Sequence, residues 1–289
     1  MYDNLRFFNW YGNGDLFNSR EFIKELMKKI PASKYWYHHP KYPRMFEDIS
    51  ELEYAKITKD CSNAKGFIKK ENDLYINTWI GRENRYVLEG IGCTVRKNLE
   101  MYNNILSSAG LSVRLEKSPE EYLPRVDFSK LELENVDTWV RENQEKRIVL
   151  LCTNRAQSCQ SSNFDMLPTL DRIFTEFKDI VFVVTDDCPE YPNVFRSKDI
   201  TKTVDGFDLN EISYLSLFAD TIIGRPTGPF VFCQNMDNCM NKDKKVLGFS
   251  FHQNSVTFAH DVPIKMSVFW SGATSNEEVY LEIKEILEK

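Results

Sequence analysis

Hydrophobic stretches of strand length alternate with amphipathic helical stretches along most of the chain. The apolar run at 5–11 is followed, after a glycine-rich break, by a helical pattern at 19–30. The same reasoning predicts strands at 34–39, 53–58, 73–81, 147–154, 179–187 and 244–251, helices at 95–110, 137–144, 165–177, 210–220 and 275–289, and a strand, turn and helix at 221–235. Such alternation is the pattern of βαβ units around a parallel sheet.

The alternation is interrupted at 114–135, which is polar, contains two prolines and shows no sustained hydrophobic period. A segment of this kind is typical of a boundary between domains, and 289 residues leave room for two domains that each have a core. We therefore predict an α/β protein of two Rossmann-like domains, an N-terminal one at 1–135 and a C-terminal one at 136–289.

Composition narrows the classes of function. The chain is 42% hydrophobic and 28% charged, as soluble globular proteins are, and its net charge of −6 argues against binding to nucleic acid or to an anionic membrane surface. No stretch approaches about 18 consecutive apolar residues and no apolar leader follows the N-terminus, so we expect a cytoplasmic protein without an integral membrane segment. The seven cysteines form no CxxC pair and only four histidines are present, which favours free thiols and no bound metal.

The first candidate site is the break at 12–15, where Gly12, Asn13, Gly14 and Asp15 separate the first strand from the helical pattern. A strand that ends in glycines and leads into a helix often borders a ligand crevice. Two interpretations of Asp15 stay open, because an aspartate at this place either takes part in chemistry or caps the helix.

The second candidate site is the turn GRPTGPF at 224–230, which follows the apolar residues 221–223. A glycine-rich turn that opens a helix presents unpaired N–H groups and suits a phosphate, to which Arg225 would add a cationic fork. The alternative is a tight turn shaped by its two prolines, with Arg225 in solvent.

Two further features of the second half carry polar side chains. The loop at 153–163, rich in hydroxyl and amide groups and containing Arg155, follows the strand at 147–154; it is either a ligand-binding loop or a solvated one. In the sequence DLNE at 208–211, Asp208 fits the N-cap of a capping box, while Glu211 is either its partner or an acceptor for the hydroxyls of a ribose.

The order of these features resembles the GT-B fold glycosyltransferases, and most closely the ADP-heptose:lipopolysaccharide heptosyltransferase family. The likeness is carried by GNGDLFNSREFIKEL near the start and by FADTIIGRPTGPFVF near the end. It implies that two Rossmann-like domains face each other across a cleft, with an acceptor bound by the first domain and a nucleotide-sugar by the second. It also implies that Asp15 is the general base and that Thr227, Gly228 and Pro229 lie by the donor diphosphate. Pro226 departs from the family, which usually has an aspartate there.

On this hypothesis the reaction is a single displacement that inverts the anomeric centre and needs no metal or other cofactor. Asp15 takes the proton of an acceptor hydroxyl, and Arg155, Arg225 and the N–H groups near Gly228 stabilise the leaving diphosphate. We expect Glu211 at the donor, Gly12 and Gly14 to leave room for the acceptor, and Trp79 to stack on an acceptor sugar unless it belongs to the core.

Two other classes of function remain open. The chain could be a non-catalytic protein that binds a nucleotide or a sugar, or a GT-B-shaped epimerase or hydrolase that acts on the nucleotide-sugar itself. The sugar, the base, the acceptor and the oligomeric state are left open by the sequence.

Overall fold

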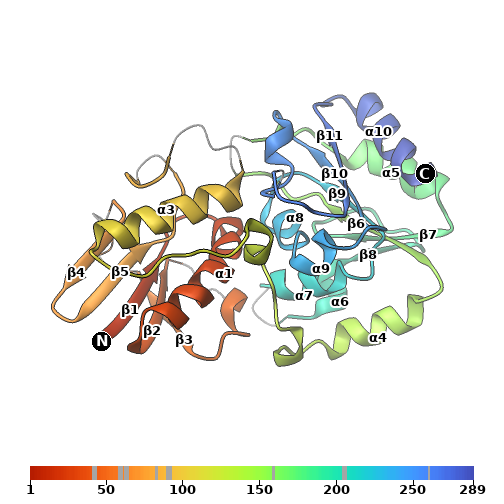
Figure 1. The fold of residues 1–289 in the computed structure, drawn as a ribbon. Helices are drawn as coiled ribbons and strands as arrows, with labels where there is room; N and C mark the ends of the chain where they lie inside the picture. The colour runs from red at the N-terminus through yellow and green to blue at the C-terminus, as the bar shows by residue number, and fades with distance from the viewer. Residues whose placement is uncertain are drawn as a thin grey trace. The chain divides into compact units, whose positions relative to one another are not determined.

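The chain folds as two compact units. Unit 1 comprises Met1–Lys130 with Phe258–Pro263, and unit 2 comprises Leu131–Thr257 with Ile264–Lys289. This computed structural model describes residues 1–40, 44–57, 61, 65–81, 84–88, 93–157, 160–203, 207–259 and 261–289. Each unit is an α/β layer structure around its own sheet (Figure 1).

Unit 1 is built on a five-stranded sheet in the order β3-β2-β1-β5-β4, in which only the edge strand β4 runs antiparallel to its neighbour. The strands are β1 Tyr2–Phe8, β2 Ala32–His39, β3 Leu52–Lys56, β4 Phe67–Lys70 and β5 Asp73–Asn77. The order changes direction at β1, because β2 and β3 lie on one side of it and β5 on the other. Phe8 pairs with both His38 and Asn77, so these three strands end level with one another.

The helices described in unit 1 pack in part through aromatic side chains. They are α1 Asn13–Lys29 and α3 Thr94–Ser108, with the short 3-10 helices η1 Arg44–Phe46, η2 Pro119–Tyr122 and η3 Phe128–Lys130. Phe22 of α1 stacks on Tyr122 and on Tyr102 of α3, with ring centroids 4.3 and 5.3 Å apart. The segment Phe258–Pro263 joins this unit, since the carbonyl of Phe258 accepts hydrogen bonds from Val95 N at 3.3 Å and from Cys93 Sγ at 3.4 Å.

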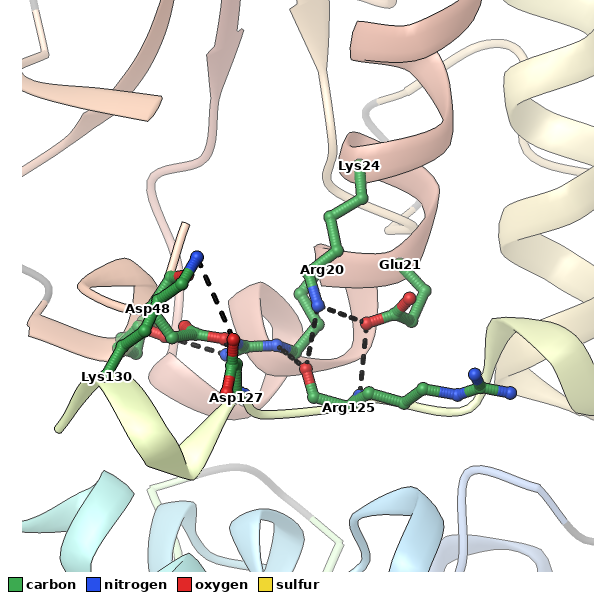
Figure 2. A network of polar contacts seen from close by, with 8 residues as sticks. Arg20, Glu21, Lys24, Asp48, Arg125, Asp127 and Lys130 are labelled. Carbon is green, nitrogen blue, oxygen red and sulfur yellow. Dashed lines mark hydrogen bonds and ion pairs between the residues drawn. The ribbon is translucent and has the colours of Figure 1, made fainter. Parts of the chain in front are cut away.

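A buried ion pair holds α1 in place (Figure 2). Arg20 is fully buried; it pairs with the Asp48 carboxylate and donates to the carbonyl oxygens of Met45, at 2.7 Å, and Arg125, at 2.9 Å. The second oxygen of Asp48 accepts from the backbone N–H of Asp127 at 3.0 Å. These contacts fix the helix that begins beside Asp15 to the turn after η1 and to the 125–127 segment.

Unit 2 contains a six-stranded parallel sheet in the order β11-β10-β9-β6-β7-β8. The strands are β6 Arg147–Cys152, β7 Ile180–Val184, β8 Val194–Arg196, β9 Thr221–Gly224, β10 Lys245–Phe249 and β11 Ser267–Ser271. The chain starts at β6, moves outward to β8, then returns to the other side of β6 at β9. This is the doubly wound Rossmann order, which places a topological switch point between β6 and β9.

Helices cover the sheet of unit 2 and bury both of its faces. They are α4 Glu134–Asn143, α5 Leu167–Glu176, α6 Ser197–Thr201, α7 Leu209–Leu215, α8 Gly228–Phe232, α9 Met236–Cys239 and α10 Asn276–Glu288, with the 3-10 helix η4 Gln253–Ser255. The helices α5 and α10 lie side by side (Figure 1) and pack Ile173 and Ile283 against Val149 of β6. Leu150, next along β6, points to the opposite face and is also buried. Continuous burial explains why this strand is apolar throughout.

Among the described residues, no helix is both long and apolar enough to cross a membrane. The six cysteines in the same ranges are free thiols, and Cys159 lies outside the described residues.

Candidate functional site

The first site lies at the carboxyl ends of the strands of unit 1, where the order changes direction at β1. Backbone hydrogen bonds join the segments that leave these strands: Thr78 N donates to Phe8 O at 3.0 Å, and Asn9 N donates to His38 O at 3.2 Å. In open α/β sheets, ligands bind at such a switch point.

Asp15 is the third residue of α1, which begins at Asn13 rather than at 19 as the hydrophobic pattern predicts. Gly12 is the N-cap and provides no side-chain cap. The carboxylate of Asp15 accepts from the backbone N–H groups of Gly12 and of Asp15 itself, yet burial outweighs these bonds and raises its pKa to about 6. The two interpretations of Asp15 are therefore compatible: the carboxylate reaches back to the helix start and remains titratable near neutral pH.

No cation among the described residues contributes to the pKa of Asp15. Tyr37 is buried nearby with its hydroxyl 2.9 Å from Thr78 Oγ1; burial raises the pKa of Tyr37, and the negative charge of Asp15 raises it further. The pKa of His38 is lowered, mainly by burial. The contributions that the described residues make to the Asp15 pKa are burial and backbone hydrogen bonds.

The structure brings Trp79 to the same edge. Its ring stacks on that of Tyr11, with centroids 3.7 Å apart and an interplanar angle of 19°. Tyr11 precedes Gly12, which is exposed, and a Cβ at Gly12 would lie 3.7 Å from Asp15 Oδ2; Gly14 is half-buried. Asp15, Gly12, Gly14 and Trp79 thus lie together, and Tyr11, an aromatic residue at the end of the first predicted strand, belongs to the same group.

The second site lies at the switch point of unit 2. Cys152, the last residue of β6, is opposite Gly224, the last residue of β9. A Cβ on Gly224 would lie 2.5 Å from the carbonyl oxygen of Cys152, so this close approach of the two strand ends requires glycine. The loop at 153–163 and the turn at 224–230, which the sequence selected separately, consequently begin side by side.

Arg225 joins these two segments instead of lying in solvent. Only 2% of it is exposed; Nη1 donates to Thr153 O at 3.0 Å, Nη2 donates to Phe164 O, and the guanidinium lies over the Phe164 ring at 4.5 Å. Its Nε has no partner among the described residues. Burial, and then the charge of Arg155, lower the pKa of Arg225, which places the exposed Arg155 near it.

Thr227 is the N-cap of α8, and Gly228 and Pro229 are its first two residues. The Thr227 side chain is 8% exposed and makes no cap hydrogen bond, and Oγ1 has no partner within the described ranges. The Thr227 N–H donates to Arg225 O at 2.7 Å, which shapes the turn. A buried hydroxyl without a protein partner is costly unless a ligand or water satisfies it.

Glu211 is buried in the first turn of α7, and α7 packs against α8. Asp208 is at the N-cap position, as predicted, but makes no side-chain cap bond; it accepts from Ser197 Oγ at 3.2 Å and from Thr201 Oγ1 at 3.4 Å. The helix that carries Glu211 is close to the turn, since Leu209 methyl groups would lie 3.7 Å from a Cβ at Gly228.

Some polar side chains of the loop at 153–163 already make hydrogen bonds within the protein. Asn154 donates to Thr185 O at 3.1 Å, and Asn163 exchanges hydrogen bonds with the backbone of Ala156 at 2.7 and 2.9 Å. Ser158 and Cys159 lie outside the described residues. Over the part of the chain that is described, no three His, Cys, Asp or Glu side chains form a group that could hold a metal ion.

Comparison with known proteins identifies the fold. The sequence matches no model of a known protein family and no curated protein. A family 9 glycosyl transferase from Veillonella parvula is similar in structure over 100% of this chain and 90% of its own, with a TM-score of 0.55 and 11% identity. The Escherichia coli heptosyltransferase WaaC with ADP is similar over 99% and 98%, with a TM-score of 0.53 and 9% identity. The same enzyme with ADP-2-deoxy-2-fluoro heptose also gives a TM-score of 0.53, over 99% of both chains at 6% identity. The predicted fold class, two Rossmann-like α/β halves of the glycosyltransferase type, is confirmed.

Proposed function

We propose that this protein is a glycosyltransferase that moves a sugar from a nucleotide-sugar to a hydroxyl acceptor, with Asp15 as the general base. The observation that carries the proposal is the Asp15 carboxylate, whose pKa is raised to about 6 by burial at the switch point of unit 1. A general base works best when its pKa is near the working pH, because it is then mostly ionised and still basic. A carboxylate that only capped a helix would need no such burial. The fold shared with WaaC, which is bound to ADP, supports the same class of reaction.

In this proposal the donor binds to unit 2 at the ends of β6 and β9. The Thr227 hydroxyl and the N–H groups near Gly228 contact the diphosphate, with Pro229 fixing the first turn of α8. Arg155 adds positive charge, and Glu211 accepts hydrogen bonds from the ribose. Arg225 braces the turn against the loop at 153–163 through its two carbonyl contacts and offers only its Nε to a ligand.

The acceptor binds to the N-terminal domain, at about 1–135, with Gly12 and Gly14 leaving space beside Asp15. Asp15 removes the hydroxyl proton as the acceptor oxygen attacks the anomeric carbon, and the bond to the diphosphate breaks in the same step. One displacement inverts the anomeric centre. Hydrogen-bond donors and Arg155 then stabilise the leaving diphosphate, and no metal is required.

Replacing Asp15 tests the proposal. D15N should lower transfer by about 10²-fold or more, as loss of a general base does, and leave binding of the nucleotide-sugar unchanged by calorimetry. The matched control is D3N, which removes an exposed carboxylate from the opposite end of β1 and should leave transfer intact. Transfer that survives in D15N refutes the role of Asp15. Nucleotide release that proceeds equally without an acceptor would favour the hydrolase.

A further inference from the structure

An aromatic pair stands beside the proposed base. Tyr11 is 38% exposed although its ring stacks on Trp79. Its backbone is fixed on both sides: Tyr11 N donates to Asn9 Oδ1 at 2.8 Å, and His39 Nε2 donates to Tyr11 O at 2.9 Å. Because Asn9 and His39 are fully buried, the backbone of Tyr11 is anchored to the core.

Trp79, the other ring of the stacked pair, is also held by its surroundings. A Cβ on Gly81 would lie 2.0 Å from Trp79 Nε1, so the backbone of Gly81 packs directly against the indole. Nε1 is buried, and Trp79 is less exposed than Tyr11. Of the two stacked rings, Tyr11 therefore offers more surface to a ligand, while Trp79 holds it.

The charges at this edge indicate what such a ligand is. An anionic acceptor would be repelled by the Asp15 carboxylate and would raise its pKa further, and no cation among the described residues contributes to that pKa to compensate. The face of an aromatic ring is electronegative and also disfavours an anion, whereas it attracts the C–H groups of an uncharged ring. A cationic acceptor would form an ion pair with Asp15, lower the pKa of its carboxyl group and so make it a weaker base.

We propose that Tyr11 is a specificity-determining residue that stacks on the acceptor, and that the part of the acceptor bound there is an uncharged sugar ring. This inference rests on the proposed function, because it assigns the substrate of the same site. Trp79 is a positioning residue that acts through Tyr11. The amide of Asn9, whose Oδ1 accepts from Tyr11 N, has a buried Nδ2 without a partner in the described part of the chain.

The test measures binding, so it does not depend on transfer. The probes are the methyl glycosides of glucose, galactose, mannose and N-acetylglucosamine, with glucose 6-phosphate and glucosamine as charged probes, each followed by saturation-transfer NMR. We expect at least one neutral glycoside to bind more tightly than either charged probe. Y11A should raise the dissociation constant of that glycoside about two- to tenfold. Y11F keeps the aromatic ring and should bind the glycoside as tightly as the wild type does.

The matched control is F218A, which removes an equally exposed aromatic side chain, 39% exposed, from unit 2 and should change nothing. Absence of binding by all four neutral glycosides, tighter binding of a charged probe, or equal binding to Y11A would overturn the inference. Nucleotide binding by the wild type is measured in parallel by calorimetry. If the wild type binds no nucleotide, the proposed glycosyltransferase function itself is contradicted. If it binds a nucleotide but no glycoside, only the role of Tyr11 is contradicted.

Discussion

Replacing Asp15 by asparagine should stabilise the protein at neutral pH, although it should lower transfer by about 10²-fold or more. Burial raises the pKa of the carboxyl group from 3.8 to about 6 in the folded chain. Between these two values the folded state keeps a proton that the unfolded state has released, so the free energy of unfolding falls as the pH rises through this window. Above it, the folded protein carries the full cost of an ionised, buried carboxylate.

The magnitude follows from the difference between the two pKa values. A difference from 3.8 to about 6 is worth about 3 kcal/mol at about 1.4 kcal/mol per pKa unit, and partial solvent exposure of Asp15 reduces this to about 1–3 kcal/mol. Asparagine does not ionise, and its carbonyl oxygen can still accept from the N–H of Gly12. The variant should therefore gain about 1–3 kcal/mol over the wild type at pH 8 relative to their difference at about pH 4.

Urea unfolding of both proteins, followed by circular dichroism from about pH 4 to 8, measures this gain. D3N, at the exposed carboxylate, serves as the control and should follow the wild type at every pH. A stability difference between D15N and the wild type that stays constant across this range would refute the raised pKa, and with it the argument that Asp15 is tuned as a base.

Three further predictions, the first two with a matched control variant, concern a close backbone approach, a buried ion pair and the donor site. G224A should destabilise the protein by about 1–3 kcal/mol in thermal unfolding, because its methyl group would clash with the carbonyl of the neighbouring strand. G228A, whose methyl group would only make ordinary van der Waals contact with Leu209, should cost under about 1 kcal/mol; equal losses would contradict this. R20M should cost about 3–5 kcal/mol by stranding a buried carboxylate, and K24M, which breaks a partly exposed pair, under about 1 kcal/mol. T227V removes an unpartnered hydroxyl, so its stability should change by under about 1 kcal/mol while its affinity for a nucleoside diphosphate falls about tenfold in calorimetry; unchanged affinity would remove Thr227 from the donor site.

The long strands of unit 2 could be predicted from the sequence because both faces of the sheet are buried. Residues 148–152 are apolar and buried without a break, which gives β6 a signal that depends on no partner. The strand β8, of three half-buried residues, gives no comparable signal and was missed, as were β4 and β11. The return of Phe258–Pro263 to unit 1 depends on contacts with α3, which no local pattern reports.

The candidate sites could be predicted only in part, because some of their residues meet through contacts between distant segments of the chain. Asp15 and the turn at 224–230 stand out because glycines interrupt a hydrophobic pattern. The start of α1 at Asn13 is hidden because Asn13 and Gly14 have low helix propensity. In the sequence, Arg225 belongs to a glycine-rich turn that suits a phosphate. In the structure, its guanidinium donates instead to backbone carbonyls of two other segments. The Tyr11–Trp79 stack joins two loops that become neighbours only when β1 pairs with β5.

The most direct test of the proposed function is whether the protein binds one nucleotide and its sugars. Thermal unfolding is measured with ADP, UDP, GDP and CDP and with nucleotide-sugars of each base. We predict stabilisation by one base and its sugars, amounting to about 2.7 kcal/mol when the ligand is at about 100 times its dissociation constant. Unchanged unfolding across the whole set would contradict the account.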